Sequence, residues 1–273
     1  MKKFIFVLLA LFIAAGAFAQ SQTIRAFAHR GGRLERDENT AAAFQECWDA
    51  GYTGFETDIR MTKDGVLYIT HDHTLERTTN GSGIFEEKSA AEIDKLITKK
   101  GNKVMSFKEL CKFLDGKENL YVEFELKTMP VELYPQERLE EYVEKLYKGV
   151  KSLRCKNAEF VFTSSDYRGL RYLQEHHPDA KLLLIVNKPL NDETIALAKT
   201  VGIYTLGCRM EGTSRAMVGK AHKEGMTISL WPGSGIDDFL LGAYLGCDRM
   251  CCDRPVEVMN FIREKCPWLK VVY

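Results

Sequence analysis

Three short segments of the chain contain charged and imidazole side chains that are spaced closely enough to act together. They are His29-Arg30-Gly31-Gly32, Glu56-x-Asp58 with His71-Asp72-His73, and Glu123-x-Glu125-x-Lys127. Each lies in or beside an apolar run that is typical of a buried strand, so packing alone does not explain its polar groups. Because side chains two residues apart in a strand share a face, the carboxylates within each acidic segment point to one side.

The second segment can bring carboxylates and an imidazole together through a β-hairpin. The dipeptide Asp64-Gly65 lies between its two halves. Asp-Gly suits the positive φ angles of a two-residue type I′ turn. Such a turn predicts Asp58 opposite His71 and Glu56 opposite His73. Directly opposed side chains lie about 5 Å apart at Cβ, so we expect these groups to converge on one side of the hairpin.

This combination of side chains predicts a metal-assisted reaction on a phosphate ester. Clustered carboxylates repel one another unless a cation lies between them, and oxygen ligands suit Mg²⁺ or Ca²⁺ better than zinc. Arg30 and Lys127 add positive charge that can bind an anion. Two histidines can exchange protons near neutral pH. A cation and basic groups would stabilise charge on the phosphoryl oxygens, which indicates hydrolysis of a phosphodiester.

The three segments lie within a repeated alternation of strand-like and helix-like stretches. The strand-like stretches are 23–29, 54–62, 66–71, 120–127, 159–164, 181–186, 203–208, 226–231 and 249–252. The helix-like stretches are 39–50, 106–114, 136–150, 166–176, 192–201, 213–223, 237–245 and a last one from Pro255. This alternation predicts a parallel sheet with helices outside it. The length of 273 residues suits a TIM (β/α)8 barrel, which commonly takes about 250.

One strand-like stretch exceeds the eight that such a barrel needs. We interpret 66–71 as the returning arm of the hairpin rather than as a barrel strand. The segment 72–105 that follows is polar and poorly periodic. It is therefore predicted to form a small lobe inserted in a β/α connection.

Composition and the first residues of the chain limit the partners and the cellular location that we expect. The formal net charge of zero argues against a broad nucleic-acid-binding surface. Lys2 and Lys3 precede an apolar run that ends in Ala17-Phe18-Ala19, which predicts a signal peptide over 1–19. We expect a single exported domain over 20–273, periplasmic or secreted, with no stable membrane anchor.

Of the 8 cysteines, we expect most to be free and buried, and the lack of a C-x-x-C pair argues against a zinc site.

Read as a whole, the chain resembles the glycerophosphodiester phosphodiesterase family. The main similarity is the run HRGG…ENTAAAF…AGYTGFETDIRMTKDGVLYITHDHTLERTTNGSG, and it continues in FELK, VFTSSD, the LW of 226–231 and CDRP. The resemblance covers essentially all of the chain after the signal peptide. It implies a TIM barrel with a small insertion after the second histidine.

The resemblance also implies roles and a substrate. The catalytic pair would be His29 and His71. The ligands of one Ca²⁺ or Mg²⁺ would be Glu56, Asp58 and Glu125. The phosphate-binding residues would be Arg30 and Lys127. The substrate would be a small glycerophosphodiester, split into a glycerol phosphate and an alcohol. One histidine would deprotonate a glycerol hydroxyl that attacks the phosphorus, and the other would protonate the leaving alcohol. Water would then open the cyclic phosphate.

Several alternatives stay open at this point. Glu123 shares the face of Glu125 and is the other possible ligand, although the Glu-x-Lys pattern of the family selects Glu125. His73 stands where the family more often has an acid, and it either contacts the substrate or only caps the hairpin. Trp231 belongs either to the core or to the substrate pocket, and Pro-Gly-Ser-Gly follows it in place of the family's Thr-x-Asn. The alternative functions are a phosphodiesterase for lysophospholipids or glycerol-phosphate polymers and a catalytically dead, phosphodiester-binding barrel.

Overall fold

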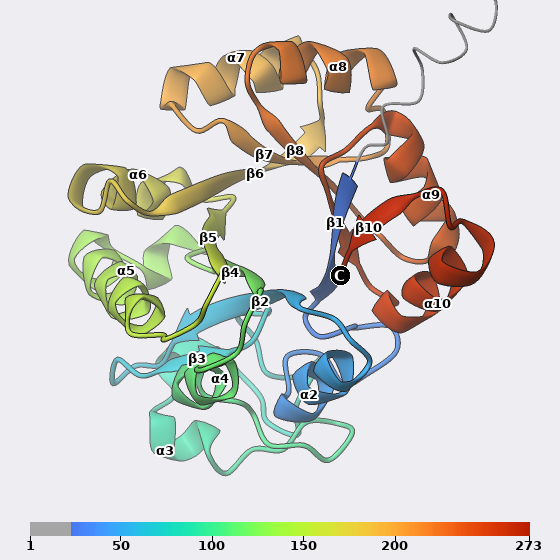
Figure 1. The fold of residues 1–273 in the computed structure, drawn as a ribbon. Coiled ribbons are helices and arrows are strands. Elements are labelled where there is room, and N and C mark those ends of the chain that lie inside the picture. The colour runs from blue at the N-terminus through green and yellow to red at the C-terminus, as the bar shows by residue number, and fades with distance from the viewer. Residues whose placement is uncertain (1–22) are drawn as a thin grey trace, which may run out of the picture.

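The computed structural model describes residues 23–273, and the predicted signal peptide over 1–19 lies outside the described residues. Within the described part, strands alternate with helices along nearly the whole chain, as the periodicity predicts (Figure 1). Every strand-like stretch expected from the sequence forms a strand. The structure adds one that the sequence did not suggest, β10 (Lys270–Val272), near the end of the chain.

Within residues 23–273, eight strands close into the parallel barrel of a TIM (β/α)8 fold. They are β1 (Thr23–His29), β2 (Gly54–Met61), β4 (Tyr121–Leu126), β5 (Glu159–Ser164), β6 (Lys181–Pro189), β7 (Thr205–Arg209), β8 (Thr227–Trp231) and β9 (Arg249–Cys252). Each strand pairs with the next in parallel, and β1 pairs with both β2 and β9, which closes the barrel. Parallel pairing brings the carboxyl ends of all eight strands to one mouth, where active sites of this fold lie.

The helices surround the barrel in the order of the chain (Figure 1). They are α2 (Ala41–Asp49), α4 (Phe107–Leu114), α5 (Gln136–Lys151), α6 (Tyr167–His176), α7 (Asp192–Val201), α8 (Arg215–Lys223), α9 (Ile236–Leu245) and α10 (Pro255–Lys265). Several begin at side chains that accept a hydrogen bond from the first turn, including Thr40 before α2 and Ser106 before α4. The helix starts lie within two residues of those expected from the sequence.

The hairpin after β2 is real, but its register differs from the prediction. Strand β3 (Leu67–Ile69) runs antiparallel to β2 on the outside of the barrel, and Ile59 pairs with Ile69. The backbone oxygen of Asp58 accepts a hydrogen bond from the nitrogen of Thr70 at 3.0 Å. Asp58 therefore lies opposite Thr70, and the prediction that it lies opposite His71 was wrong by one residue.

The register differs because the turn has three residues rather than two. The nitrogen of Thr62 donates to the oxygen of Val66 at 2.9 Å, which leaves residues 63–65 as the loop. The Thr62 hydroxyl supports this loop by donating to Asp64 Oδ1 at 2.7 Å and accepting from the Val66 nitrogen at 3.0 Å. Only Gly65 then needs a positive φ, and its value is 81°.

The segment 72–105 packs against the barrel beside the hairpin with little regular structure of its own. It contains a 3₁₀ helix, η1 (Phe85–Glu87), and the short α3 (Ala90–Ile93). Tyr68 of β3 joins Leu75 and the buried side chains of these two helices in a small apolar cluster. A further 3₁₀ helix, η2 (Val131–Leu133), follows β4.

The apolar interior is divided between two places. The larger cluster lies between the barrel and the helices. A second cluster, whose buried members are Phe27, Tyr121, Val161, Leu183 and Cys251, comes from alternate positions of the barrel strands. Because the residues on these strands alternate between the two clusters, the second one fills the inside of the barrel. The polar groups at the mouth lie in the layer above this cluster, at the carboxyl ends of the strands.

Two further features concern the state of the cysteines and the length of the helices. The 8 cysteines all fall within residues 23–273, and each is a free thiol. Burial raises the pKa of several of them, for example that of Cys208 to about 12. None of the helices described over 23–273 is both long enough and apolar enough to cross a membrane.

Candidate active site

Parallel register brings the acidic segments together at one side of the barrel mouth. His29, the last residue of β1, pairs with Glu56 of β2, and Glu56 pairs with Glu123 of β4. One layer higher, Asp58 pairs with Glu125. These pairings come from neighbouring parallel strands, so they do not depend on the hairpin. The carboxylates converge although the reasoning from the turn was wrong.

Glu56, Asp58 and Glu125 form a cluster that can hold a metal ion. One carboxylate oxygen of each lies within 4.8 Å of the others. Glu56 Oε1 and Asp58 Oδ1 are buried and have no hydrogen-bond partner in the described structure. Burial, and then repulsion from Asp58 and Glu125, raises the pKa of Glu56 well above its usual value. Unpartnered oxygens on crowded carboxylates fit a hard divalent cation that would satisfy them.

Two basic side chains flank this cluster. Arg30 Nε lies 3.0 Å from Asp58 Oδ2, and Lys127 Nζ lies 2.9 Å from Glu125 Oε1. Burial would raise the pKa of Asp58, but Arg30 first, and then His71 and Lys127, holds it well below its usual value. The structure thus places both residues that were predicted to bind phosphate against the carboxylates that were predicted to bind the metal.

His29 is oriented by a carboxylate from the other end of the chain. Its Nδ1 atom lies 2.5 Å from Asp253 Oδ1, and its Nε2 atom lies 3.7 Å from Glu56 Oε2. Burial would raise the pKa of Asp253, but His29 and Arg33 lower it, so it is ionised and can only accept. The Nδ1 atom of His29 therefore donates, and Nε2 is the atom free to exchange a proton.

The loop after β8 holds Asp253 in place. The nitrogen of Asp253 donates to the oxygen of Gly233 at 2.8 Å. A Cβ atom at position 233 would lie 1.7 Å from the backbone oxygen of Cys251, so only glycine permits this approach.

His71 is oriented in the same way by its neighbour. Strand β3 ends at Ile69, and the His71 Nδ1 atom lies 2.7 Å from Asp72 Oδ1. The bond to His71 lowers the pKa of Asp72, so Asp72 is an acceptor and Nδ1 donates. Both histidines therefore bind an aspartate through Nδ1 and leave Nε2 available.

Residues 29–257 match the glycerophosphoryl diester phosphodiesterase family. The chain belongs to this family. It is 29% identical over 244 residues to the glycerophosphodiester phosphodiesterase of Caldanaerobacter subterraneus subsp. tengcongensis, which covers 87% of this chain and 97% of that protein. It is also 44% identical to glycerophosphodiester phosphodiesterase 1 of Homo sapiens, but over 73 residues that make up 27% of this chain and 22% of the human one.

Solved structures share the fold. A phosphodiesterase of Oleispira antarctica, determined in complex with the product sn-glycerol-3-phosphate, superposes with a TM-score of 0.76 at 18% identity, covering 88% of this chain and 96% of that one. A glycerophosphodiester phosphodiesterase of Parabacteroides distasonis superposes with a TM-score of 0.73 at 19% identity, covering 90% and 99%. At these identities the likeness establishes the barrel and nothing finer.

Arg77 links the side of the site that carries His71 to the side that carries Arg30. Its guanidinium bonds Asp72 through Nε and Glu38 through both terminal nitrogens, at 2.8 and 2.7 Å. Glu38 also accepts from Arg30 at 3.0 Å. A continuous set of charged hydrogen bonds therefore runs from His71 through Asp72, Arg77 and Glu38 to Arg30.

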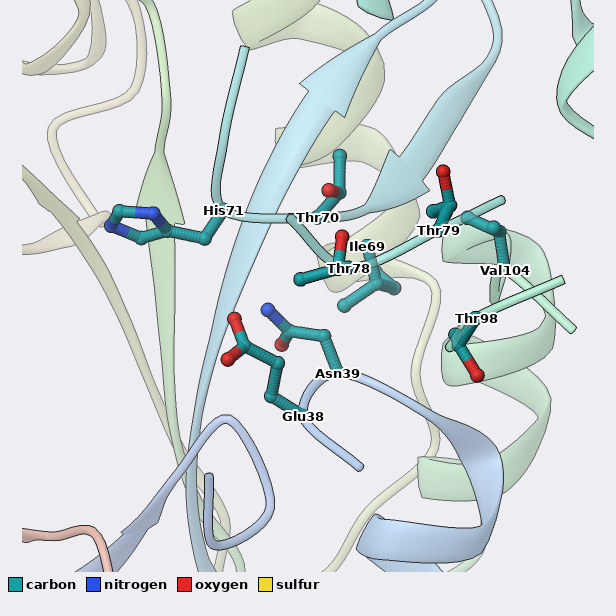
Figure 2. A pocket seen from close by; sticks show the side chains of 9 residues that line it. All are labelled: Glu38, Asn39, Ile69, Thr70, His71, Thr78, Thr79, Thr98 and Val104. Atoms are coloured by element: carbon teal, nitrogen blue, oxygen red, sulfur yellow. The ribbon is translucent and has the colours of Figure 1, made fainter. Parts of the chain in front are cut away.

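Glu38 and His71 border a small cavity between the barrel and the 72–105 segment (Figure 2). It measures about 20 Å³, enough for roughly one water molecule. Threonine side chains line much of it, and the imidazole of His71 points away from them (Figure 2).

The residues left open by the sequence fall into distinct places. Glu123 lies level with Glu56 and one layer below Asp58 and Glu125, where Tyr121 donates to it and burial raises its pKa to about 7. His73 is exposed, and its backbone oxygen accepts from Phe85 at 2.8 Å. Its predicted position opposite Glu56 was wrong, since β2 pairs with β3 only from Ile59 onward. Trp231 ends β8 and packs on the apolar cluster inside the barrel.

Sequence reasoning missed three supporting residues and placed a fourth only loosely. Asp253 belongs to the CDRP segment, but nothing local indicates that it binds His29, 224 positions away. Asp72 and Arg77 lie in the histidine segment, yet their side-chain bonds depend on the lobe. The residue types of Glu38-Asn39-Thr40 predict a helix start beside the site, with Asn39 or Thr40 as the cap. Thr40 is the cap of α2, and Asn39 Nδ2 donates to Asp58 Oδ2 at 2.9 Å.

Proposed function

We propose that this chain hydrolyses glycerophosphodiesters to a glycerol phosphate and an alcohol with the help of one divalent cation, Ca²⁺ or Mg²⁺. The observation that carries the proposal is the cluster of Glu56, Asp58 and Glu125, whose oxygens lie within 4.8 Å of one another beside His29. The match to the glycerophosphoryl diester phosphodiesterase family supports the substrate class.

Glu56, Asp58 and Glu125 would hold the cation, which when bound would offset negative charge on the phosphoryl oxygens. Arg30 and Lys127 carry the remaining positive charge around the phosphate. Burial would lower the pKa of Arg30, but Asp58, Glu56 and Glu38 raise it, so it stays a cation during turnover. Their fixed positions act as preorganised electrostatic stabilisation of the transition state.

His29 and His71 would perform the proton transfers through their Nε2 atoms. One accepts the proton of the glycerol hydroxyl that attacks the phosphorus, and the other donates a proton to the oxygen of the departing alcohol. This step yields a cyclic phosphate, and the same pair with reversed roles would activate and direct the water that opens it. Asp253 and Asp72 hold the rings in the tautomer that this exchange needs.

The direct test is hydrolysis of glycerophosphocholine and glycerophosphoethanolamine by the purified chain. Release of choline or ethanolamine together with a glycerol phosphate is expected, with loss on chelation and recovery on adding Ca²⁺ or Mg²⁺. Phosphorus NMR would detect the cyclic phosphate. Turnover of lysophospholipids or glycerol-phosphate polymers alone would favour the related substrates, and binding without any turnover would indicate a dead barrel. Turnover that persists in the presence of a chelator would refute the proposed dependence on a divalent cation.

We also propose that the protein is exported, on the basis of the signal peptide expected over 1–19. The mature protein should begin at Gln20 and occur outside the cytoplasm. Mass spectrometry of the N-terminal peptide after fractionation tests this, and an intact Met1 in the cytoplasmic fraction would refute it.

A further inference from the structure

The side of the barrel mouth opposite the cluster of Glu56, Asp58 and Glu125 carries the positively charged side chain of Arg209, which the proposed reaction does not use. In the order of the barrel strands, β7 lies diametrically across from β2, which carries Glu56 and Asp58. Arg209 is the last residue of β7, and Trp231 is its partner at the end of β8. Both lie at the carboxyl ends of their strands, on the same face as the catalytic groups.

The side chain of Arg209 points into the barrel mouth. Leu206 and Cys208 of β7 belong to the outer apolar cluster, so Gly207 and Arg209 face inward. A Cβ atom on Gly207 would lie 3.0 Å from Leu183, a member of the cluster inside the barrel. The guanidinium of Arg209 lies over the Trp231 ring, 5.5 Å from its centroid, and Trp231 rests on that same inner cluster.

Arg209 has donors to spare for a ligand. One terminal nitrogen donates to Asn187 Oδ1 at 3.3 Å. Glu211 is 3.7 Å away and 87% exposed, so solvent screens that pair, and the Arg209 side chain is itself 41% exposed. The contact with the Trp231 ring restrains the guanidinium, and such a planar group can bind a carboxylate or phosphate through two parallel hydrogen bonds.

The arrangement disfavours a cationic head group. A trimethylammonium ion is usually recognised on the face of an aromatic ring. Arg209 already lies over the Trp231 ring, and its charge would repel a second cation. Because β7 lies across the barrel from β2, any group of a substrate that extends over the mouth from a scissile phosphate at the carboxylate cluster would approach this side of the mouth.

We propose that Arg209, held by Trp231, selects glycerophosphodiesters whose leaving alcohol carries an additional anionic group, a phosphate monoester or a carboxylate. This inference rests on the proposed function for the position of the scissile phosphate. Arg209 acts on substrate choice and takes no part in the proton transfers.

Matched substrates that differ by one phosphate test the inference. The specificity constant kcat/KM would be measured for glycerophosphoinositol 4-phosphate, glycerophosphoinositol and glycerophosphocholine. The wild-type chain should prefer the first by about tenfold or more, as expected for a hydrogen-bonded charge pair. R209Q should lose that preference while its turnover of glycerophosphoinositol stays near wild type. The control is R215Q, because Arg215 stacks on Tyr244 at 5.5 Å between two outer helices.

Calorimetry with inositol 4-phosphate separates this inference from the proposed function, since it needs no turnover. Binding that is about tenfold weaker in R209Q than in the wild type and R215Q supports the anion site, even if no substrate is hydrolysed. An equal substrate ratio in R209Q and wild type, equal binding of inositol 4-phosphate, or a wild-type preference for glycerophosphocholine would overturn it. Circular dichroism checks that R209Q is folded.

Discussion

The Nδ1 atom of His29 lies 2.5 Å from Oδ1 of Asp253, and Arg33 in turn donates to that carboxylate from Nε at 2.8 Å. His71, Asp72 and Arg77 repeat the same sequence of imidazole, aspartate and arginine on the other side of the site. Each histidine thus has a carboxylate that fixes its tautomer and an arginine that fixes the carboxylate. Because each imidazole ring is held by its own aspartate, the effect of ring orientation on activity can be tested at each histidine separately.

Asp253→Asn should lower kcat by about tenfold or more, bounded by the ~10²–10⁴ that an acid–base group contributes. The amide keeps the shape of the carboxylate but no longer enforces the Nδ1–H tautomer of His29. Asp248→Asn is the matched control, because Asp248 also binds a histidine, His222, at 2.9 Å but outside the mouth. Steady-state kinetics on both variants decides the matter, and an Asp253→Asn enzyme with wild-type kcat would contradict it.

His29→Ala and His71→Ala should each reduce turnover by about 10²–10⁴ without unfolding the protein. Both rings are partly exposed at the mouth, so neither removal leaves a large internal cavity. His73→Ala serves as the control, since this exposed side chain lies outside the cluster. Turnover near the wild-type rate in either of the first two variants would end their assignment as a pair.

Glu56→Gln or Asp58→Asn should weaken binding of Ca²⁺ or Mg²⁺ by more than the about 10–100-fold typical of losing a supporting residue around a metal. Each removes one carboxylate from the cluster proposed to hold the cation. Titration calorimetry measures the affinity directly. Glu123→Gln, level with Glu56 but outside the three-carboxylate cluster, should bind the cation as the wild type does, and a larger effect there than at Asp58 would make Glu123 the true ligand.

Arg77→Gln should lower kcat by about tenfold, because it releases both Asp72 and Glu38. If Arg77 acts through Glu38, the double variant with Glu38→Gln should lose less than the sum of the two single changes in free energy. Arg77→Lys should recover only part of the activity, since one ammonium cannot replace the planar group at both carboxylates. Strictly additive effects would show that Arg77 and Glu38 work separately.

Much of this protein was legible in its sequence because the signals are local. Strand periodicity placed Glu56 with Asp58, and Glu125 with Lys127, each on one face, and helical periodicity marked the helices between the strands. Once the barrel closes, parallel register between β1, β2 and β4 brings these faces together with His29, whatever the turn between β2 and β3 does. The fold and the metal cluster follow from such repeated, short-range patterns.

Tertiary structure decided what depends on single contacts between distant segments. The hairpin register follows from a three-residue loop in place of the two-residue turn suggested by Asp64-Gly65, and the Thr62 hydroxyl supports that loop through its bonds to Asp64 and Val66. Asp253 reaches His29 only because β9 closes the barrel against β1, and Arg77 reaches Glu38 only because the 72–105 segment packs beside the mouth. Arg209 and Trp231 are 22 residues apart in sequence, and parallel pairing of β7 with β8 places them side by side. Periodicity reports which face a residue occupies, but the partner it meets is set by the packing of whole elements.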